Sequence, residues 1–359
     1  MKKVAQLLYP GIGGLGSVVF NLVEQNKIKK KWKDFLVFTG PNFSKRNKDL
    51  LKNYKTEYYF NKTKKFLTFL TWPKIFIALL KFKPDILIIH NFDIIPSIIY
   101  KIIFKKKIIY VDHTPHFGKI GIKLLIVYFF VKYFSDKIVV LNKDKFKFFL
   151  KKKILKKKLY IIPNGIKNIK VKKIKKFYEK KLVIGMASRM NYKKCHELII
   201  DTFNSKKIRD KNFFCYFAGD GENIQYLKNK VKKLSLENKI FFLGNLKEKD
   251  LHSFYKKLDL YIQASKGEVL SISILEAFNY QIPAMGSNVE GIKNFLIPKK
   301  KIGIKFENNK KSLLKKIIYF HKLNKKMKSE YSKNQKKYFI EKFTSEKMYK
   351  NYQELLNNV

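Results

Sequence analysis

Short apolar runs that alternate with longer helical patterns are the feature that most constrains the fold of this chain. Such runs, each followed by turn residues, are typical of strands in a parallel α/β sheet. The predicted strands are 4–9, 35–39, 86–90, 108–112, 137–141 and 159–162, then 182–187, 213–218, 240–243, 258–262 and 282–286. The strand pattern stops near residue 165 and restarts at Leu182, which predicts two Rossmann-like, doubly wound parallel sheets in tandem.

The length of 359 residues suits two domains of ~150–180 residues each. We place the first domain at 1–168, a basic and weakly periodic linker at 169–181, and the second domain at 182–335. In open α/β sheets ligands bind beyond the carboxyl ends of the strands. With two such sheets, we expect the domains to face each other across a cleft that holds the ligand.

The charge of the chain is strongly unbalanced, with 79 Lys and Arg against 27 Asp and Glu and a net charge of +52. Such a field attracts nucleic acid, anionic lipid or phosphorylated ligands. Codon drift in an AT-rich genome is the alternative, because the abundant residue types all have AT-rich codons. The lysines lie in every surface segment rather than in one arm. We therefore expect an anionic membrane surface as a partner and no specific nucleic acid.

Cysteine usage and the apolar segments bear on location. Cys195 and Cys215 have neither metal-ligand spacing nor a disulfide framework, which suits a reducing compartment. The N-terminus shows no signal-peptide pattern. The most apolar window, 120–134, contains lysines and is shorter than the ~20 residues of a spanning helix, so it predicts a buried or interfacial helix. We expect a cytoplasmic protein, peripheral on the inner face of the cytoplasmic membrane.

A glycine-rich turn follows the first strand, with the sequence Gly11-Ile12-Gly13-Gly14-Leu15-Gly16. It matches the turn of dinucleotide-binding folds, but such folds also need an acid at the end of the second strand. That strand ends in 37–40 without an acid, and Asp34 lies at its beginning instead. A nicotinamide-dependent enzyme is therefore disfavoured. The turn is either a tight structural connection or a loop whose amides approach a sugar or phosphate.

Polar residues also end the fourth predicted strand, where Asp112 is followed by His113 and, after Thr114 and Pro115, by His116. A single histidine at a strand end is often only a satisfied polar residue. Two histidines within four residues, at the edge of the sheet that holds the glycine turn, favour contact with a substrate. His113 is the stronger candidate.

In the second half, Arg189 and Lys194 lie five residues apart on the loop after strand 182–187. This spacing allows the two cations to clamp a diphosphate. Arginine is scarce in this chain, so Arg189 carries more information than any one lysine. The turn Gly219-Asp220-Gly221 follows the next strand, and such turn residues are partly explained by chain reversal alone.

Two carboxylates, Glu268 and Glu276, stand eight residues apart at the end of strand 258–262. Glu276 has a structural explanation, because Ser273 and Glu276 form the pattern of a capping box with Ser273 as the N-cap. Glu268 has one as a solvated loop acid. However, acids are rare here, and free amides at 270–273 would suit a phosphate. We expect these carboxylates to lie opposite the loop of Arg189 and Lys194.

Together these residues resemble family 4 of the retaining GT-B glycosyltransferases. The Glu268-x7-Glu276 spacing and the pair Arg189 and Lys194 are similar to that family's carboxylate motif and its phosphate-binding pair. Further similar segments are 13–14, 83–85, His113, 163–165, 219–221, 242–244, 281–283 and Gly291. The closing segment 336–359 looks like the helix that in this fold crosses back onto the first, acceptor-side domain.

The resemblance implies a role for each matched residue. Glu276 should hold the ribose hydroxyls of a nucleotide sugar, and Arg189 and Lys194 its diphosphate. Glu268 and His113 should contact the donor sugar. The remaining predicted nucleotide-binding residues are Gly13, Gly14, Gly219, Asp220, Gly244, Leu270, Ser271 and Ile272.

The resemblance also implies the reaction, which is transfer of a sugar from a uridine or, second, a guanosine diphosphate donor. The acceptor would be a bacterial surface glycan or a lipid-linked acceptor. The chain contains no Asp-x-Asp, so no metal ion or other cofactor is expected. It departs from the family at 269–271 and at Ser273. It also departs at Cys195, a position at which glycine is usual in the family. A catalytically inactive nucleotide-binding homologue and a basic nucleic-acid-binding protein remain as alternatives.

Overall fold

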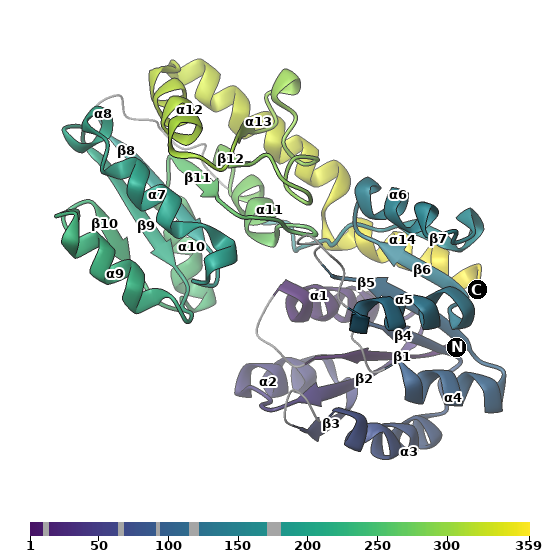
Figure 1. Ribbon diagram of the computed structural model, residues 1–359. Helices are drawn as coiled ribbons and strands as arrows, with labels where there is room; N and C mark the ends of the chain where they lie inside the picture. The colour runs from purple at the N-terminus through teal and green to yellow at the C-terminus, as the bar shows by residue number, and fades with distance from the viewer. Residues whose placement is uncertain (10–13, 64–67, 91–93, 115–121, 171–180) are drawn as a thin grey trace. The chain divides into compact units, whose positions relative to one another are not determined.

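The computed structural model describes residues 1–9, 14–63, 68–90, 94–114, 122–170 and 181–359. The chain divides into two compact units (Figure 1). Among the described residues, unit 1 comprises 1–9, 14–63, 68–90, 94–114, 122–167 and 343–359, and unit 2 comprises 168–170 and 181–342. Within these described ranges, no helix has the length and apolar character needed to cross a bilayer.

Unit 1 contains a seven-stranded sheet in the order β3-β2-β1-β4-β5-β6-β7, and every neighbouring pair is parallel. Its strands are β1 (Lys3–Leu8), β2 (Lys33–Gly40), β3 (Glu57–Lys62), β4 (Ile86–Ile89), β5 (Lys107–Asp112), β6 (Lys137–Val140) and β7 (Leu159–Ile161). The sequence analysis missed β3. This edge strand, Glu-Tyr-Tyr-Phe-Asn-Lys, has charged residues at both ends and only one buried position, so it lacks the buried aliphatic run that marks the central strands.

Helices cover both faces of this sheet. On one face lie α1 (Gly14–Lys29) and α2 (Lys45–Tyr54), whose inward side chains share a core with Leu36 and Phe38 of β2. The other face carries α3 (Trp72–Phe82), α4 (Ile95–Phe104), α5 (Ile122–Phe134) and α6 (Lys143–Lys151), with the short helices η1 (Thr68–Thr71) and η2 (Lys156–Lys158) nearby in the chain. Alternation along the strands divides the two cores, as expected for a sheet buried on both faces.

The C-terminal segment 336–359, expected as one helix, is two helices. α13 (Lys325–Lys342) belongs to unit 2, and α14 (Ser345–Asn357) belongs to unit 1 and packs on α1. Thr344 separates them, because its side chain accepts a hydrogen bond from the amide of Lys347 and caps α14. Ile166 pairs with Thr344, and a Cβ on Gly165 would lie 2.3 Å from the Thr344 carbonyl oxygen. Glycine in the 163–165 turn therefore admits the returning chain.

Unit 2 contains a six-stranded parallel sheet in the order β10-β9-β8-β11-β12-β13. Its strands are β8 (Leu182–Ala187), β9 (Phe213–Ala218), β10 (Ile240–Phe242), β11 (Leu260–Gln263), β12 (Ala284–Ser287) and β13 (Ile304–Phe306). The first two agree with the prediction residue for residue. The strand predicted at 258–262 starts later, because Leu258 ends a helix and the Asp259 carboxylate accepts from the Val183 amide. The three-residue β13 was not predicted.

The helices of unit 2 are α7 (His196–Phe203), α8 (Lys206–Arg209), α9 (Ile224–Lys233), α10 (Glu248–Lys257), α11 (Ile272–Asn279), α12 (Lys310–Lys322) and α13, with η3 (Tyr192–Lys194) and η4 (Pro298–Lys300) between them. α7, α8, α9, α12 and α13 share one core cluster with the strands, whereas the buried side chains of α10 and α11 lie outside that cluster and these two helices contact β8, β11 and β12. The strand order reverses direction between β8 and β11. Ligands of open α/β sheets bind at such a reversal, beyond the carboxyl ends of the strands.

Candidate functional site

The site in unit 2 is built from the two loops that leave β8 and β11, which are neighbours in the sheet. Their backbones are tied together, because the Lys193 carbonyl accepts hydrogen bonds from the Lys266 amide at 2.8 Å and from Ser265 Oγ at 3.2 Å. Ser265 Oγ also contacts the Gly267 carbonyl at 3.0 Å. The predicted juxtaposition of the Arg189–Lys194 loop with the Glu268 loop is therefore present.

Lys194 and Glu268 form a direct ion pair between Lys194 Nζ and Glu268 Oε1, both partly buried. The backbone of Glu268 is held by the Glu290 carbonyl, which accepts from the Glu268 amide at 3.1 Å. A Cβ on Gly291, which has a φ of +74°, would lie 1.8 Å from the Glu268 carbonyl oxygen. Gly291 is thus required for the position of the Glu268 loop.

Glu276 lies on α11 and does not act as the acid of a capping box, so that sequence interpretation is wrong. The N-cap is Ser271, whose Oγ accepts from the Ile274 amide at 3.4 Å. Ser273 Oγ instead donates to the Ala187 carbonyl at the end of β8, at 2.8 Å. Glu276 Oε2 accepts a hydrogen bond from the Tyr255 hydroxyl at 2.7 Å. Its carboxylate is partly exposed at the carboxyl edge of the sheet.

An aromatic cluster behind α11 fixes this carboxylate. Tyr255 is fully buried, and its ring stacks on that of Tyr280 with centroids 5.0 Å apart. Burial and the nearby Glu276 charge hold the pKa of the Tyr255 phenol well above its ordinary value. The phenol therefore stays protonated and donates to the Glu276 carboxylate. The sequence analysis missed Tyr255, for which an aromatic residue on a helix gave no distinctive signal.

Arg189 is exposed, and its guanidinium lies 3.3 Å from the Glu222 carboxylate. Backbone hydrogen bonds hold its loop beside the turn after β9, since Met190 donates to the Asp220 carbonyl at 2.9 Å. A Cβ on Gly219, which has a φ of +124°, would lie 2.2 Å from the Ser188 carbonyl oxygen. Gly219 and Asp220 thus shape the loop of Arg189, and their direct contact with a nucleotide stays a prediction.

The other predicted phosphate ligands lie at the start of α11. Leu270 is buried, Ser271 is the N-cap and Ile272 is the first helical residue. The backbone amides at a helix start carry a partial positive charge and bind anions. Gly244 has a φ of +64°, and its carbonyl accepts from the Gly219 amide at 2.7 Å. It supports the turn after β9.

Cys195 occupies a backbone conformation that usually belongs to glycine. It lies between η3 and α7 with a φ of +43°, in the left-handed region that side chains with a Cβ adopt rarely. This is the position at which the sequence departs from the glycine of the resembling family. The chain therefore keeps the bend after Lys194 without the residue that adopts it most easily.

The glycine turn of unit 1 is only partly described. Gly13 and His116 lie outside the described residues, and Gly14 is the first residue of α1, earlier than the helix start predicted near Ser17. Asp34 is buried at the amino end of β2, where Asn26 and Trp32 donate to its carboxylate at 2.6 and 2.9 Å. That position is opposite to the one a ribose-binding acid of a dinucleotide fold would occupy.

His113 follows β5 and belongs to a polar chain that runs through the core of unit 1. His113 Nε2 lies 3.0 Å from His90 Nδ1, and His90 Nε2 lies 3.2 Å from Gln6 Oε1. Gln6 Nε2 donates to Asp34 Oδ1 at 3.2 Å. Gln6 is buried in the otherwise apolar β1, so a polar residue within an apolar strand was the signal that sequence analysis overlooked.

These contacts assign the protons of the chain. The Asp34 carboxylate accepts from Gln6 Nε2, so Gln6 Oε1 faces His90 and receives the proton of His90 Nε2. His90 Nδ1 is then an acceptor, and His113 Nε2 donates to it. His113 is left with an unprotonated Nδ1. Burial lowers the pKa of His113 to about 4, although Asp112 opposes the shift, so the ring is neutral near pH 7.

Asp112 anchors the turn that carries His113. Its carboxylate lies 3.2 Å from the Lys145 ammonium of α6, and neither side chain is exposed. The second oxygen accepts from the Thr114 amide at 3.0 Å. A buried pair such as this one is costly to break, because either charge alone would lack a partner. His113 is therefore placed by a rigid strand end, and its contact with a sugar stays a prediction.

No group of three or more His, Cys, Asp and Glu residues within the described parts of the chain could hold a metal ion. Metal independence of the reaction remains a prediction.

Residues 167–338 match the family described as Glycosyl transferases group 1. An uncharacterized glycosyltransferase of Methanocaldococcus jannaschii is 25% identical over 403 residues, which cover 100% of this chain and of that protein. The O-antigen biosynthesis glycosyltransferase WclY of Escherichia coli is 29% identical over 236 residues, 63% of this chain and 62% of WclY. A second M. jannaschii glycosyltransferase is 27% identical over 66% of each chain. The alignments with WclY and with this second protein thus each span under two thirds of the relative's length.

Solved structures resemble the whole chain. HepE of Anabaena, in complex with UDP and glucose, has a TM-score of 0.83 at 15% identity, covering 100% of both chains. A glycosyltransferase of Rickettsia africae has a TM-score of 0.81 at 18% identity, covering 99% of this chain and 97% of that one. The chain has the GT-B fold of glycosyltransferases. Unit 2 contains the segment that matches the glycosyl transferases group 1, and unit 1 contains His113.

The buried histidines of this GT-B protein determine how its free energy of unfolding should depend on pH. Burial lowers the pKa of His113 and of His196 to about 4, and that of His90 well below its ordinary 6.5. Below pH 6.5 the unfolded chain therefore binds protons that the folded chain does not. For each such histidine, the free energy of unfolding should fall by about 1.4 kcal/mol for every pH unit by which the pH is lowered. Asp34, whose pKa burial raises to about 6, opposes this with one proton.

Urea unfolding between pH 7 and pH 5 measures this slope, and His196→Phe tests its assignment. The His196 ring is buried and makes an edge contact with Phe217 at 5.1 Å, which a phenyl ring can keep. In this variant, the slope of the unfolding free energy against pH should be smaller by the contribution of one histidine. An unchanged slope would show that His196 does not titrate as its burial requires.

Proposed function

We propose that this GT-B protein transfers a sugar, with retention of anomeric configuration, from a nucleoside diphosphate sugar to an acceptor hydroxyl. The observation that carries the proposal is the arrangement at the carboxyl edge of the unit 2 sheet. There, the Glu276 carboxylate, the Lys194–Glu268 pair and the start of α11 gather on the linked loops of β8 and β11. The match of residues 167–338 to the glycosyl transferases group 1 supports it.

Glu276 suits the ribose of the donor. A carboxylate offers about four lone-pair sites on its two oxygens, so accepting from Tyr255 is compatible with accepting from ribose hydroxyls as well. Tyr255 orients the carboxylate from the buried side, so little side-chain entropy is lost when a nucleotide binds. The structural role that competes with this proposal, the capping box, is absent because Ser271 is the cap.

Arg189 and Lys194 suit the diphosphate. Charge grows on the diphosphate as the bond from its oxygen to the anomeric carbon breaks, and fixed cations stabilise that charge most when they are positioned in advance. Lys194 is held by Glu268, and the start of α11 adds amide dipoles. In this proposal these groups take the place of a metal ion. Because Lys194 binds the diphosphate in this proposal and is paired with Glu268, the Glu268 carboxylate lies beside the donor sugar.

The retaining step that we propose uses the donor's own phosphate as the base. The acceptor oxygen forms its bond to the anomeric carbon on the face that the diphosphate leaves. The acceptor proton passes to the departing phosphate oxygen. Atoms and charge balance without a protein nucleophile. This fits a site in which Glu268 is already paired with Lys194.

Relatives support the substrate classes. HepE of Anabaena is seen with UDP and glucose, and a TarM structure of Staphylococcus aureus contains UDP, so we propose a uridine diphosphate sugar first and a guanosine one second. WclY belongs to O-antigen biosynthesis. We accordingly propose a bacterial surface glycan or lipid-linked molecule as the acceptor, at the cytoplasmic side of the membrane.

A catalytically inactive homologue is the second candidate, and Cys195 favours it. The bend after Lys194 is strained for a residue with a Cβ, which could displace the ammonium from the phosphate. The two candidates differ in turnover. An active enzyme releases nucleoside diphosphate from the sugar donor, whereas an inactive one binds the nucleotide without releasing product.

Glu276→Gln tests the ribose contact. The amide replaces one acceptor with a donor and removes the charge, so affinity for uridine diphosphate should fall by ~1.5–3 kcal/mol, measured by calorimetry. The unfolding free energy without ligand should change little. The matched control is Glu237→Gln, at an exposed position of unit 2, which should bind as the parent does. Parental affinity in Glu276→Gln would refute the ribose assignment.

Arg189→Ala tests the diphosphate contact. Affinity for uridine diphosphate should fall by ~1.5–3 kcal/mol, while affinity for uridine should hardly change, because only the phosphates lose a partner. Arg209→Ala is the control, since Arg209 is the other arginine of unit 2 and bonds only to Asn204 and the Leu234 carbonyl among the contacts described. An equal loss for uridine and its diphosphate would mean that Arg189 is structural.

A further inference from the structure

The outward sides of α4 and α5 in unit 1 are apolar where a soluble helix is normally polar. We call this surface the α4–α5 face. Its exposed residues are Ile99, Ile102, Ile103 and Phe104 of α4 and Leu125, Ile126, Phe129 and Tyr133 of α5. Ile102 is 63% exposed and Phe129 is 58% exposed. A helix that is apolar all round is usually buried on both sides, so something must cover this face.

The two helices present this surface side by side. Tyr100 of α4 and Val131 of α5 point inward into the same core cluster on one face of the sheet. Lys101 of α4 bridges to α5, because its ammonium donates to the Phe134 carbonyl at 2.9 Å. Because this bridge joins the two helices, their exposed residues lie over neighbouring helices rather than at isolated positions. Contiguous apolar surface of this kind marks an interaction site.

The other face of the same sheet provides a contrast. Among the described residues of α1, α2 and α14, Ile28 is the only large hydrophobic residue that is exposed, at 65%. Codon drift acts on all helices alike, so it does not account for an apolar surface confined to one side of the unit.

Charge indicates what covers the face. Residues 72–158, which include α3 to α6, contain 20 lysines, no arginine, five aspartates and no glutamate. Asp85 and Asp136 are already paired with Lys106 and Lys101. A second copy of this chain would bring a net charge of +52 against an equal one, which opposes self-association. An anionic lipid surface satisfies both the apolar and the basic character.

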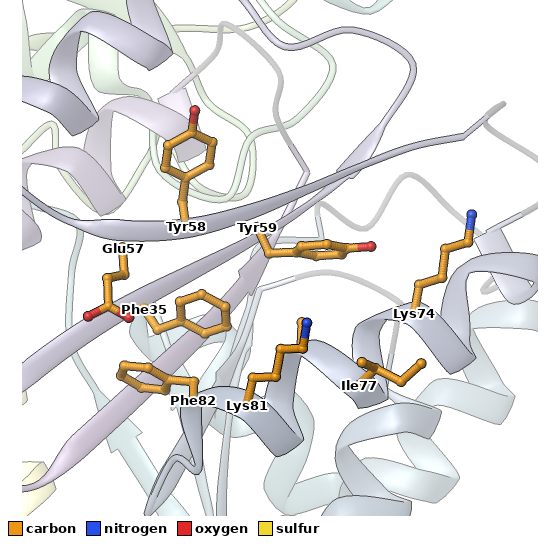
Figure 2. A pocket seen from close by; sticks show the side chains of 9 residues that line it. Phe35, Glu57, Tyr58, Tyr59, Lys74, Ile77, Lys81 and Phe82 are labelled. Carbon is orange, nitrogen blue, oxygen red and sulfur yellow. The ribbon is translucent and has the colours of Figure 1, made fainter.

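A cavity next to α3 has the same mixed character. It has a volume of about 460 Å³ and lies between α3 and the edge strand β3. Figure 2 shows Lys74, Ile77 and Lys81 projecting from one helix beside Tyr59. α3 packs directly on α4, where the ring of Phe76 contacts that of Tyr100. Apolar walls and free ammonium groups thus continue from the α4–α5 face to the edge of the sheet.

We propose that the α4–α5 face is a membrane-docking surface that inserts its apolar side chains among the lipids of an anionic bilayer. α4 and α5 have 10 and 13 residues, so they lie along the interface rather than span it. Lys105 follows α4, and Lys132 of α5 lies over the Tyr133 ring at 5.4 Å. These ammonium groups are placed to reach lipid phosphates while their stems stay in the apolar layer. This inference concerns unit 1 alone and does not depend on the proposed reaction.

Vesicle sedimentation with the full-length chain tests this surface. Vesicles of equal parts phosphatidylglycerol and phosphatidylcholine should bind the chain, and vesicles of phosphatidylcholine alone should bind it far more weakly. Ile102→Glu and Phe129→Glu should each lower the partition coefficient by about tenfold or more, because each replaces an inserted apolar group with a charge. Both positions are exposed, so thermal unfolding should match the parent.

Ile28→Glu is the matched control, since it makes the same change at equal exposure on the opposite face of the sheet. It should bind vesicles like the parent, apart from the effect of one added charge. Equal losses in Ile28→Glu and Ile102→Glu would reduce the effect to net charge and overturn the proposal. Equal binding of the parent to neutral vesicles would overturn the anionic specificity. A dimer in solution that Ile102→Glu dissociates would assign the face to a second copy.

Phe129→Trp supplies a direct readout of insertion. Its indole fluorescence should be quenched by brominated acyl chains in anionic vesicles more strongly than the emission of the parent, whose Trp32 is buried and whose Trp72 is half-buried against the core of unit 1. Absence of quenching in vesicle-bound protein would contradict insertion of α5. Uridine diphosphate affinity, measured on the same variants, should stay parental, and that result separates failure of the membrane proposal from failure of the proposed reaction.

Discussion

The parallel pairing of β8 with β11 is the constraint on which the proposed donor site depends. These strands are distant in sequence and adjacent in the sheet, so the loops that follow them emerge side by side. The Asp259 carboxylate, which accepts from the Val183 amide at 2.8 Å, sets the start of this pairing. Gly185 of β8 allows this pairing, because a Cβ at residue 185 would lie 2.5 Å from a methyl carbon of Leu258. The ion pair of Lys194 and Glu268 depends on this register.

The site and the polar core of unit 1 use buried polar groups in the same way. Tyr255 orients Glu276 in unit 2, and the chain from Asp34 through Gln6 and His90 orients His113 in unit 1. In both cases a buried partner holds a group at the carboxyl edge of a sheet. Burial strengthens these hydrogen bonds and makes their loss costly. The fold therefore orients the two groups, Glu276 and His113, to which we assign contact with the substrate in the proposed function.

Much of this could be predicted from sequence because parallel strands leave a strong local signal. Both strands at 182–187 and 213–218 were placed residue for residue, and the Arg189, Lys194 and Glu268 loops converge as expected. β3 was missed because charged residues bound its short aromatic run, and β13 because a lysine stands in the middle of its three residues. The cap of α11 was misplaced because Ser271 and Ser273 fit the cap position equally well by type. Tertiary contact with Ala187 decided between them.

A crystal structure of the chain grown with uridine diphosphate would locate the nucleotide directly. We expect the ribose hydroxyls within hydrogen-bonding distance of the Glu276 carboxylate, with the phosphates at Arg189, Lys194 and the first amides of α11. Nucleotide bound only by surface lysines, or density that leaves Glu276 without contact, would contradict it. Such an outcome would assign the carboxyl edge of the unit 2 sheet to another ligand.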